Sequence, residues 1–216
     1  MATFANDTFT DTDGTALASH TADDGGTWTE HTSYGTGDAV ISDANRARTT
    51  TANATCYYHS GTPLNANYSV QATIHQVSAA GSPAICGRID TAANTMYFAR
   101  YNNGGSSWEL FKLVAGTPTQ IDGGAVGQAL SNGVGYVLKL EMIGDQLRVY
   151  VDGTLIIGPI TNADITAAGK AGIRNNSTAT NATARHWDNF SAVDISVGDF
   201  RSTERGVTRG VCRGVA

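Results

Sequence analysis

The chain has 216 residues, of which 41% are hydrophobic and only 15% are charged, and its formal net charge is −5. This much apolar sequence can form a core, which excludes a fully disordered chain, and the scarcity of Glu and Lys disfavours long surface helices. Residues 1–200 carry 10 basic and 18 acidic side chains, and this acidic body argues against nucleic acid as a partner. No apolar run approaches the ~18 residues that a membrane-spanning helix requires, and residues 1–10 lack the features of a secretory signal peptide.

Strand-like segments separated by turn signals occupy the middle of the chain. YSVQATIHQV (68–77) alternates apolar and polar residues, which predicts a half-buried strand with its even-numbered residues inside. AICGRI (84–89) and TMYFARY (95–101) read as further strands. The turn sequence NNGG (102–105) then predicts a hairpin whose return strand is SWELFKLV (107–114).

The second half of the chain continues in the same way. VGYVLKLEMI (134–143) and QLRVYV (146–151) flank a Gly-Asp turn and predict a second hairpin, and an Asp-Gly turn leads into TLIIG (154–158). GIRNN (172–176) and RHWDNFSAVDI (185–195) read as the last two strands. The pattern therefore predicts an all-β fold of roughly ten to twelve strands.

One short segment, NADITAAG (162–169), is the only weak candidate for a helix. No interior stretch has the composition of a linker, so we expect one antiparallel two-sheet sandwich over residues 1–197, followed by an extended tail over 198–216. The first strand, near Phe4–Phe9, and the last, near Trp187–Ile195, are expected to pair because the termini of such sandwiches lie close together.

Four segments together carry a family resemblance: DTFTDTDGTALASHTADDGGTW (7–28), LRVYVDGTLI (147–156), AGIRNN (171–176) and HWDNFSAVDI (186–195). This series resembles the concanavalin A-like jelly rolls of lectins and glucanases, specifically the laminin G-like branch. The resemblance covers residues 1–197 and implies two packed sheets, often with a sugar site or a calcium ion. Similar modules are frequent in bacteriophage tail and capsid proteins and in bacterial surface proteins.

Glycoside hydrolysis is one activity of this fold class. A retaining glycosidase needs two carboxylates about 5 Å apart, and the glucanases of the fold place them on one strand as Glu-x-Asp-x-x-Glu. No such motif occurs here, and Glu30, Glu109, Glu141 and Glu204 are scattered along the chain. We therefore predict that the protein is not an enzyme, with a glycoside hydrolase as the third-ranked alternative.

Calcium is the cofactor that the sequence allows. Asp11 and Asp13 flank a Gly-containing turn, and Asp188 could approach them if the first and last strands pair. The alternative is an Asx-rich turn that hydrogen-bonds its own backbone. The candidate metal ligands are Asp11, Asp13 and Asp188.

Aromatic and polar side chains gather around the NNGG hairpin. Sugars bind exposed aromatic faces flanked by hydrogen-bonding groups. Alternation places the two Tyr residues of this hairpin on one face, and the competing interpretation is that this face points into the core. The candidate sugar-binding residues are Tyr97, Arg100, Tyr101, Asn103 and Trp108.

The last twelve residues, RGVTRGVCRGVA, repeat a basic Arg-Gly-Val unit. Glycine disfavours a helix here, and an extended segment would place Arg and Val on one face and small residues on the other. Such a segment suits an anchor that becomes ordered against another copy of the chain or against a scaffold, capsid or tail protein. The candidate assembly residues are Arg205, Val207, Arg209, Val211 and Arg213.

Three cysteines occur, Cys56, Cys86 and Cys212, and we expect reduced thiols, with Cys56–Cys86 as the one possible pairing inside the body. Taken together, these features predict a non-catalytic structural component of a phage virion, either a tail appendage or a capsid decoration. Its jelly roll could also bind cell-surface glycans. It would be made in the host cytoplasm without a signal peptide and would not enter a membrane. The alternative is a lectin-like carbohydrate-binding module of a bacterial surface protein.

Overall fold

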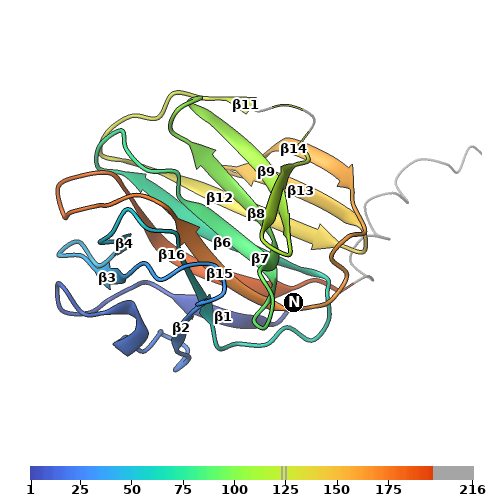
Figure 1. The fold of residues 1–216 in the computed structure, drawn as a ribbon, viewed down its shortest axis with the longest axis horizontal. Coiled ribbons are helices and arrows are strands. Elements are labelled where there is room, and N and C mark those ends of the chain that lie inside the picture. The colour runs from blue at the N-terminus through green and yellow to red at the C-terminus, as the bar shows by residue number, and fades with distance from the viewer. Residues whose placement is uncertain (123, 125, 197–216) are drawn as a thin grey trace, which may run out of the picture.

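The protein folds into two antiparallel β-sheets packed face to face (Figure 1). The structure is a computed structural model that describes residues 1–122, 124 and 126–196. Within these residues the first sheet has eight strands, with β1 (Thr3–Asp7) paired to β16 beside the main order. That order is β14 (Thr154–Thr161), β13 (Gln146–Val151), β12 (Val134–Ile143), β6 (Tyr68–Gln76), β16 (Arg185–Asp194), β4 (Ala47–Thr49) and β3 (Ala39–Ile41).

The second sheet also has eight strands within the described residues, with β11 (Val126–Gly127) paired to β9 beside the main order. One short 3-10 helix, η1 (Leu17–Ser19), precedes the sheet in the chain. The order of the second sheet is β10 (Thr117–Gln120), β9 (Ser107–Val114), β8 (Thr95–Asn102), β7 (Ala84–Asp90), β15 (Lys170–Asn175), β5 (Thr55–His59) and β2 (Trp28–Glu30).

The core lies between the two sheets and follows the predicted alternation. In β6 the even-numbered residues from Tyr68 to Ile74 are fully buried, and the odd-numbered residues between them are half-buried. The same inner layer contains Trp28, Trp108 and Trp187, all of which are almost completely buried. Burying one face of each strand is what holds the register of an antiparallel pair.

The predicted hairpins and the pairing of the terminal strands are confirmed. β8 pairs with β9, and β13 pairs with both β12 and β14. β1 pairs antiparallel with β16, which joins the first strand of the chain to the last strand that the structure describes. The all-β sandwich predicted from the sequence is therefore the observed fold. Among the described residues, no helix is long and apolar enough to cross a membrane.

The predicted helix over 162–169 is wrong, because these residues form an irregular loop between β14 and β15. The segment is too short for helix propensity to fix its conformation. Tertiary hydrogen bonds to buried side chains fix it instead. The predicted tail, with Arg205, Val207, Arg209, Val211 and Arg213, lies outside the described residues.

The outer face of the second sheet is also apolar. A second cluster of buried side chains lies there, separate from the main core. Arg174 covers it, with its guanidinium carbon 3.8 Å from the ring centre of Phe98 and 4.5 Å from that of Tyr34. Cys56 and Cys86 belong to this cluster and are buried, free thiols, as expected for these two. The cluster consists of Cys56, Ala84, Cys86, Ile89, Met96, Phe98 and Leu113.

Candidate ligand-binding pocket

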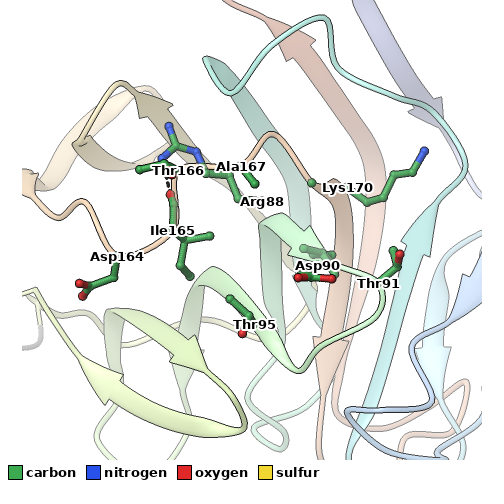
Figure 2. A pocket seen from close by; sticks show the side chains of 11 residues that line it. Arg88, Asp90, Thr91, Thr95, Asp164, Ile165, Thr166, Ala167 and Lys170 are labelled. Carbon is green, nitrogen blue, oxygen red and sulfur yellow. Dashed lines mark hydrogen bonds between the residues drawn. The ribbon is translucent and has the colours of Figure 1, made fainter.

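A hollow of about 540 Å³ opens at one end of the sandwich, and we call it the end pocket (Figure 2). Two segments form its walls: the end of β7 with the turn into β8, and the loop 162–169. Its size lies within the range of small-molecule sites. The lining residues are Arg88, Ile89, Asp90, Thr91, Thr95, Asp164, Ile165, Thr166, Ala167, Gly169 and Lys170.

Buried side chains hold the loop 162–169 in place. The guanidinium of Arg88 donates from Nη1 to the carbonyl of Ile165 at 2.7 Å, and the backbone N–H of Ile165 donates to the hydroxyl of Tyr97 at 3.1 Å. The hydroxyl of Tyr68 donates to the carbonyl of Ala168 at 2.9 Å. Burial raises the pKa of both tyrosines, so their hydroxyls keep the proton. The loop therefore forms a fixed wall although it has no regular structure.

Arg88 is 1% exposed and joins three loops at this end of the sandwich. Besides Ile165, its guanidinium donates from Nη2 to the carbonyls of Ala66 and Gly144, at 2.9 and 2.8 Å. Gly169 lies directly against it: a Cβ at this position would sit 2.4 Å from the carbonyl carbon of Arg88, and the φ of +59° also favours glycine. Arg88 is thus a structural support, because each of its three guanidinium nitrogens donates to a backbone carbonyl.

The rim of the end pocket carries polar groups that the protein only partly uses. Oδ1 of Asp90 accepts the backbone N–H groups of Ala92 and Ala93, and within the described part of the chain its Oδ2 has no hydrogen bond. Oδ2 of Asp164 pairs with the ammonium of Lys112, which lowers the pKa of Asp164. Oδ1 of Asp164 has no hydrogen bond to any residue that the structure describes. The hydroxyls of two threonines, at 91 and 166, are likewise available.

Lys170 closes the pocket on the side of β15, and Figure 2 shows its side chain extending away from Asp90. Its ammonium donates to the carbonyl oxygens of Ser60 and Gly61, at 2.7 and 3.1 Å, and to the hydroxyl of Thr62 at 2.6 Å. Three acceptors match the three N–H groups of an ammonium. Lys170 therefore contributes its stem to the pocket, and its charge is satisfied by the loop that follows β5.

The structure corrects the sugar-binding residues predicted on the β8–β9 hairpin. Tyr97, Tyr101 and Trp108 are at most 1% exposed and face the core between the sheets, so no sugar can stack on them. The alternation was right, but this face points inward, as the competing interpretation held. Arg100 lies on the outer face, where Nη2 is 2.7 Å from Oε2 of Glu109.

Asn103, the fifth predicted residue, is exposed in the turn, and its Oδ1 accepts a hydrogen bond from Nη1 of Arg185 at 3.0 Å. The structure therefore brings none of the five residues into an open aromatic site. The side chains that line the end pocket come from two segments about 75 residues apart. Sequence periodicity could not have joined them.

The predicted calcium ligands Asp11, Asp13 and Asp188 do not fit a metal site. Asp11 accepts hydrogen bonds from His20 and Thr15, and Asp13 accepts the side-chain amide of Asn181. Oδ2 of Asp188 is 3.7 Å from Nε of Arg46. Across residues 1–122, 124 and 126–196, no three His, Cys, Asp or Glu side chains gather as metal ligands. Each carboxylate instead has a side-chain partner in the protein. Asp11 also accepts a neighbouring backbone N–H, that of Thr12, as the alternative of an Asx-rich turn predicted.

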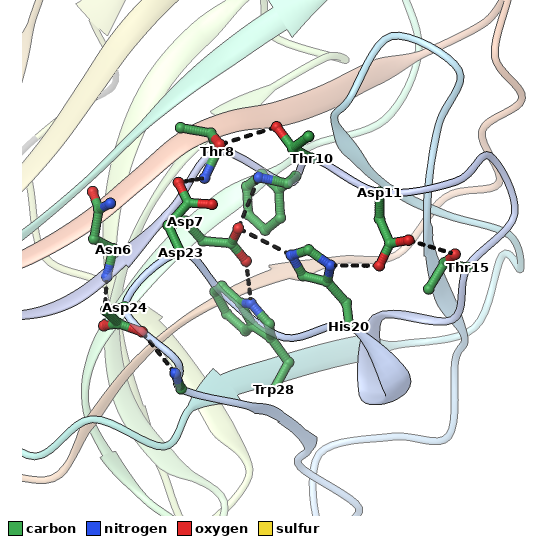
Figure 3. Close-up of polar contacts among 12 residues, drawn as sticks. Asn6, Asp7, Thr8, Thr10, Asp11, Thr15, His20, Asp23, Asp24 and Trp28 are labelled. Atoms are coloured by element: carbon green, nitrogen blue, oxygen red, sulfur yellow. Dashed lines mark hydrogen bonds and ion pairs between the residues drawn. The ribbon is translucent and has the colours of Figure 1, made fainter.

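Asp11 takes part in a buried polar network at the start of the chain (Figure 3). His20 lies between two carboxylates, with Nδ1 2.9 Å from Oδ2 of Asp11 and Nε2 3.0 Å from Oδ1 of Asp7. Burial alone would lower the pKa of His20, but the hydrogen bonds and charges of the two carboxylates outweigh it and raise the pKa. We call this trio the Asp–His–Asp clamp. It fastens the segment after β1.

Two of the glutamates, one in each sheet, are engaged in ion pairs. Glu109 pairs with Arg100, and Oε2 of Glu141 is 3.2 Å from Nζ of Lys139. These pairs lie on different sheets, β8–β9 and β12, so the carboxylates of Glu109 and Glu141 do not face each other as a catalytic pair. That the protein is not an enzyme remains a prediction.

The fold is similar to several solved structures. Carbohydrate-binding module CBM66 from Bacillus subtilis aligns with a TM-score of 0.57 at 19% identity, covering 77% of this chain and 90% of that chain. Domain 4 of AbnA, a GH43 extracellular arabinanase from Geobacillus stearothermophilus in complex with arabinotriose, aligns with a TM-score of 0.54 at 12% identity, covering 89% of this chain and 92% of that chain. A β-glucanase from Bacillus licheniformis aligns with a TM-score of 0.54 at 10% identity, covering 91% of this chain and 99% of that chain.

At such low identities these similarities establish the jelly-roll fold alone. They confirm the concanavalin A-like architecture that the sequence predicted, and they lend no support to the bacteriophage context. No protein family and no curated protein matches the sequence.

Proposed function

We propose that the chain is a carbohydrate-binding module and that its sugar site is the end pocket. The observation that carries the proposal is the fixed loop 162–169, which buried hydroxyls and the buried guanidinium of Arg88 hold against an open hollow. Ordering an irregular loop costs conformational entropy. A wall fixed before the ligand arrives lowers the cost of binding.

The free groups of the end pocket indicate the class of sugar. Among the described residues, Asp90 and Asp164 each keep one carboxylate oxygen available, beside two threonine hydroxyls. The two cations of the lining, Arg88 and Lys170, already donate to protein acceptors. Available acceptors without available cations suit the hydroxyl groups of a neutral sugar and repel the carboxylate of a uronic acid. Ile89 and Ile165 offer apolar contact for its C–H groups.

The comparisons support this proposal over a virion structural role. Two of the similar structures are a carbohydrate-binding module and an arabinanase domain in complex with arabinotriose. They favour the lectin-like alternative from the sequence over a tail appendage or capsid decoration. The anchoring role of the tail and a location on a virion or on a cell surface rest on the sequence pattern alone.

Calorimetric titration tests the proposed function. The titrants are arabino-oligosaccharides, β-gluco-oligosaccharides and polygalacturonate, an acidic polymer. We expect saturable binding of a neutral series and none of polygalacturonate. Ala167→Trp fills the end pocket from an exposed position without removing a hydrogen bond, and it is expected to weaken binding more than tenfold.

Ala44→Trp is the matched control, because Ala44 is also exposed but lies in the turn between β3 and β4. It is expected to bind like the unmodified protein. Failure of every neutral oligosaccharide to bind, or binding that Ala167→Trp leaves unchanged, would contradict the proposal.

A further inference from the structure

A second hollow of about 300 Å³ lies beside the end pocket, and we call it the side hollow. Strands β1 and β5 and the loop before β2 contribute to it. Its chemistry is different from that of the end pocket, because it includes an aromatic ring and three glycines. The lining residues are Phe4, Asp24, Gly25, Gly26, His59, Ser60 and Gly61.

The two hollows are joined at Lys170. Its stem lines the end pocket, and its ammonium is bound to the carbonyls of Ser60 and Gly61, which line the side hollow. The register of the second sheet explains this closeness. Lys170 lies opposite Ile89 of β7, and two residues further Gly172 lies opposite Tyr58 of β5, which places Lys170 level with Ser60.

The two hollows therefore lie along the same end of the second sheet, which runs across the neighbouring strands β7, β15, β5 and β2 in that order. Ser60 is joined to Thr27, just before β2, by hydrogen bonds in both directions, at 2.8 and 2.9 Å. Neighbouring strands lie about 4.8 Å apart, so the distance from β7 to β2 is roughly 14 Å. Ser60 and Thr62 are exposed and Lys170 is half-buried, so the boundary between the hollows is a low ridge.

The side hollow offers what the end pocket lacks. Phe4 is half-buried, packs edge-on against Tyr68 at 5.3 Å, and is the one aromatic benzene ring in either lining. The backbone of Phe4 lies close against Gly61, because a Cβ at Gly61 would sit 1.8 Å from the carbonyl oxygen of Phe4. Sugars present an apolar C–H face that packs on such rings.

The polar groups of the side hollow carry no net positive charge. His59 accepts the N–H of Gly61 at Nδ1, at 3.0 Å, so its ring proton is on Nε2, 3.3 Å from Oδ1 of Asp24. Burial lowers the pKa of His59, which keeps the ring neutral around pH 7. A neutral imidazole beside a carboxylate suits an uncharged ligand, as in the end pocket.

We propose that the end pocket and the side hollow are two subsites of one groove for a neutral oligosaccharide chain. The end pocket binds the hydroxyl groups of one unit, the chain crosses the Lys170 ridge, and a further unit packs on Phe4. This inference rests on the proposed function and adds a second site to it. It requires that affinity increase with chain length.

Calorimetry with arabino-oligosaccharides and β-gluco-oligosaccharides, from the monosaccharide to the hexasaccharide, tests the groove. We expect the longer members of the binding series to bind about tenfold more tightly than the shortest, which equals about 1.4 kcal/mol. Phe4→Leu keeps apolar volume against Tyr68 but removes the ring, and it is expected to abolish that gain without changing the affinity of the shortest sugar.

Phe111→Leu is the matched control, because Phe111 is also half-buried but lies on the outer face of the second sheet. Amide shifts in NMR spectra of the unmodified protein give a readout that no variant can disturb. Long oligosaccharides should shift the amides of Gly26 and Gly61 in addition to those of the end pocket. If short and long oligosaccharides bind with equal affinity, or if the amide signals of Gly26 and Gly61 do not shift, the groove proposal is wrong but the proposed function stands. If no oligosaccharide binds at all, both the groove and the proposed function are wrong.

Discussion

Replacing Asp7 by Asn is expected to destabilise the protein by about 3–5 kcal/mol, the usual cost of breaking a buried ion pair from one side. The carboxylate of Asp7 is fully buried and accepts three hydrogen bonds. They come from Nε1 of Trp28 at 2.6 Å, the backbone N–H of Phe9 at 2.8 Å and Nε2 of His20 at 3.0 Å (Figure 3).

An amide cannot serve all three donors. Whichever way the asparagine side chain of the variant turns, its NH₂ group faces at least one N–H, and turning it toward Trp28 leaves a buried indole N–H without an acceptor. Such an orphaned buried group costs about 1–3 kcal/mol. The positive charge of His20 also loses its buried partner and keeps only Asp11, whose side chain is 32% exposed. The two effects together give the expected magnitude.

Thermal unfolding followed by circular dichroism measures the effect. For a chain of this size, 1 kcal/mol shifts the melting temperature by about 2–4 °C, so a decrease of about 10 °C is expected. Asp43→Asn is the control, because Asp43 is exposed in the turn between β3 and β4, and its melting temperature should not change. If Asp7→Asn melts within about 2 °C of the unmodified protein, the buried clamp does not stabilise the fold as described.

Three further results are expected. The pKa of His20 is raised in the folded state, so its stabilisation is complete below its unfolded value of 6.5 and is lost as pH rises through the folded pKa. Melting temperatures measured from about pH 5 to about pH 9 should show this loss of stability at alkaline pH, and His20→Gln should remove it. Buried His59 has a lowered pKa, so its titration lowers the stability at acid pH instead. Arg88→Met should cost about 3 kcal/mol and speed hydrogen exchange at the amide of Ile165, because the loop 162–169 loses its support; unchanged exchange would contradict that role. Added calcium should leave the melting temperature unchanged, since Asp11 and Asp188 already have protein partners, and a rise would restore the metal hypothesis.

The layout of the strands could be predicted because its signals are local. The alternation of 68–77 gave the buried face of β6, and the NNGG and Asp-Gly turns gave the hairpins. Alternation alone could not say which face of β8 points inward, because both faces are apolar. Tyr97 packs in the core, while Phe98 lies in the second cluster beneath Arg174.

The end pocket could not be predicted, because long-range contacts create it. Arg88 reads in the sequence as one basic residue in a strand, and only the fold shows that it reaches the carbonyls of three loops. The loop 162–169 has a composition that weakly favours a helix, and hydrogen bonds to Arg88, Tyr68 and Tyr97 override that preference. A pattern within one segment contains no information about partners so far away in the chain.

The most direct measurement of the central claim is a crystal structure of the protein with a neutral oligosaccharide that binds it in solution. The account predicts a sugar unit between the turn after β7 and the loop 162–169, with hydroxyl groups within hydrogen-bonding distance of Asp90 and Asp164. A sugar bound instead on the outer face of the second sheet, beside Arg100 and Phe111, with the end pocket empty, would contradict it.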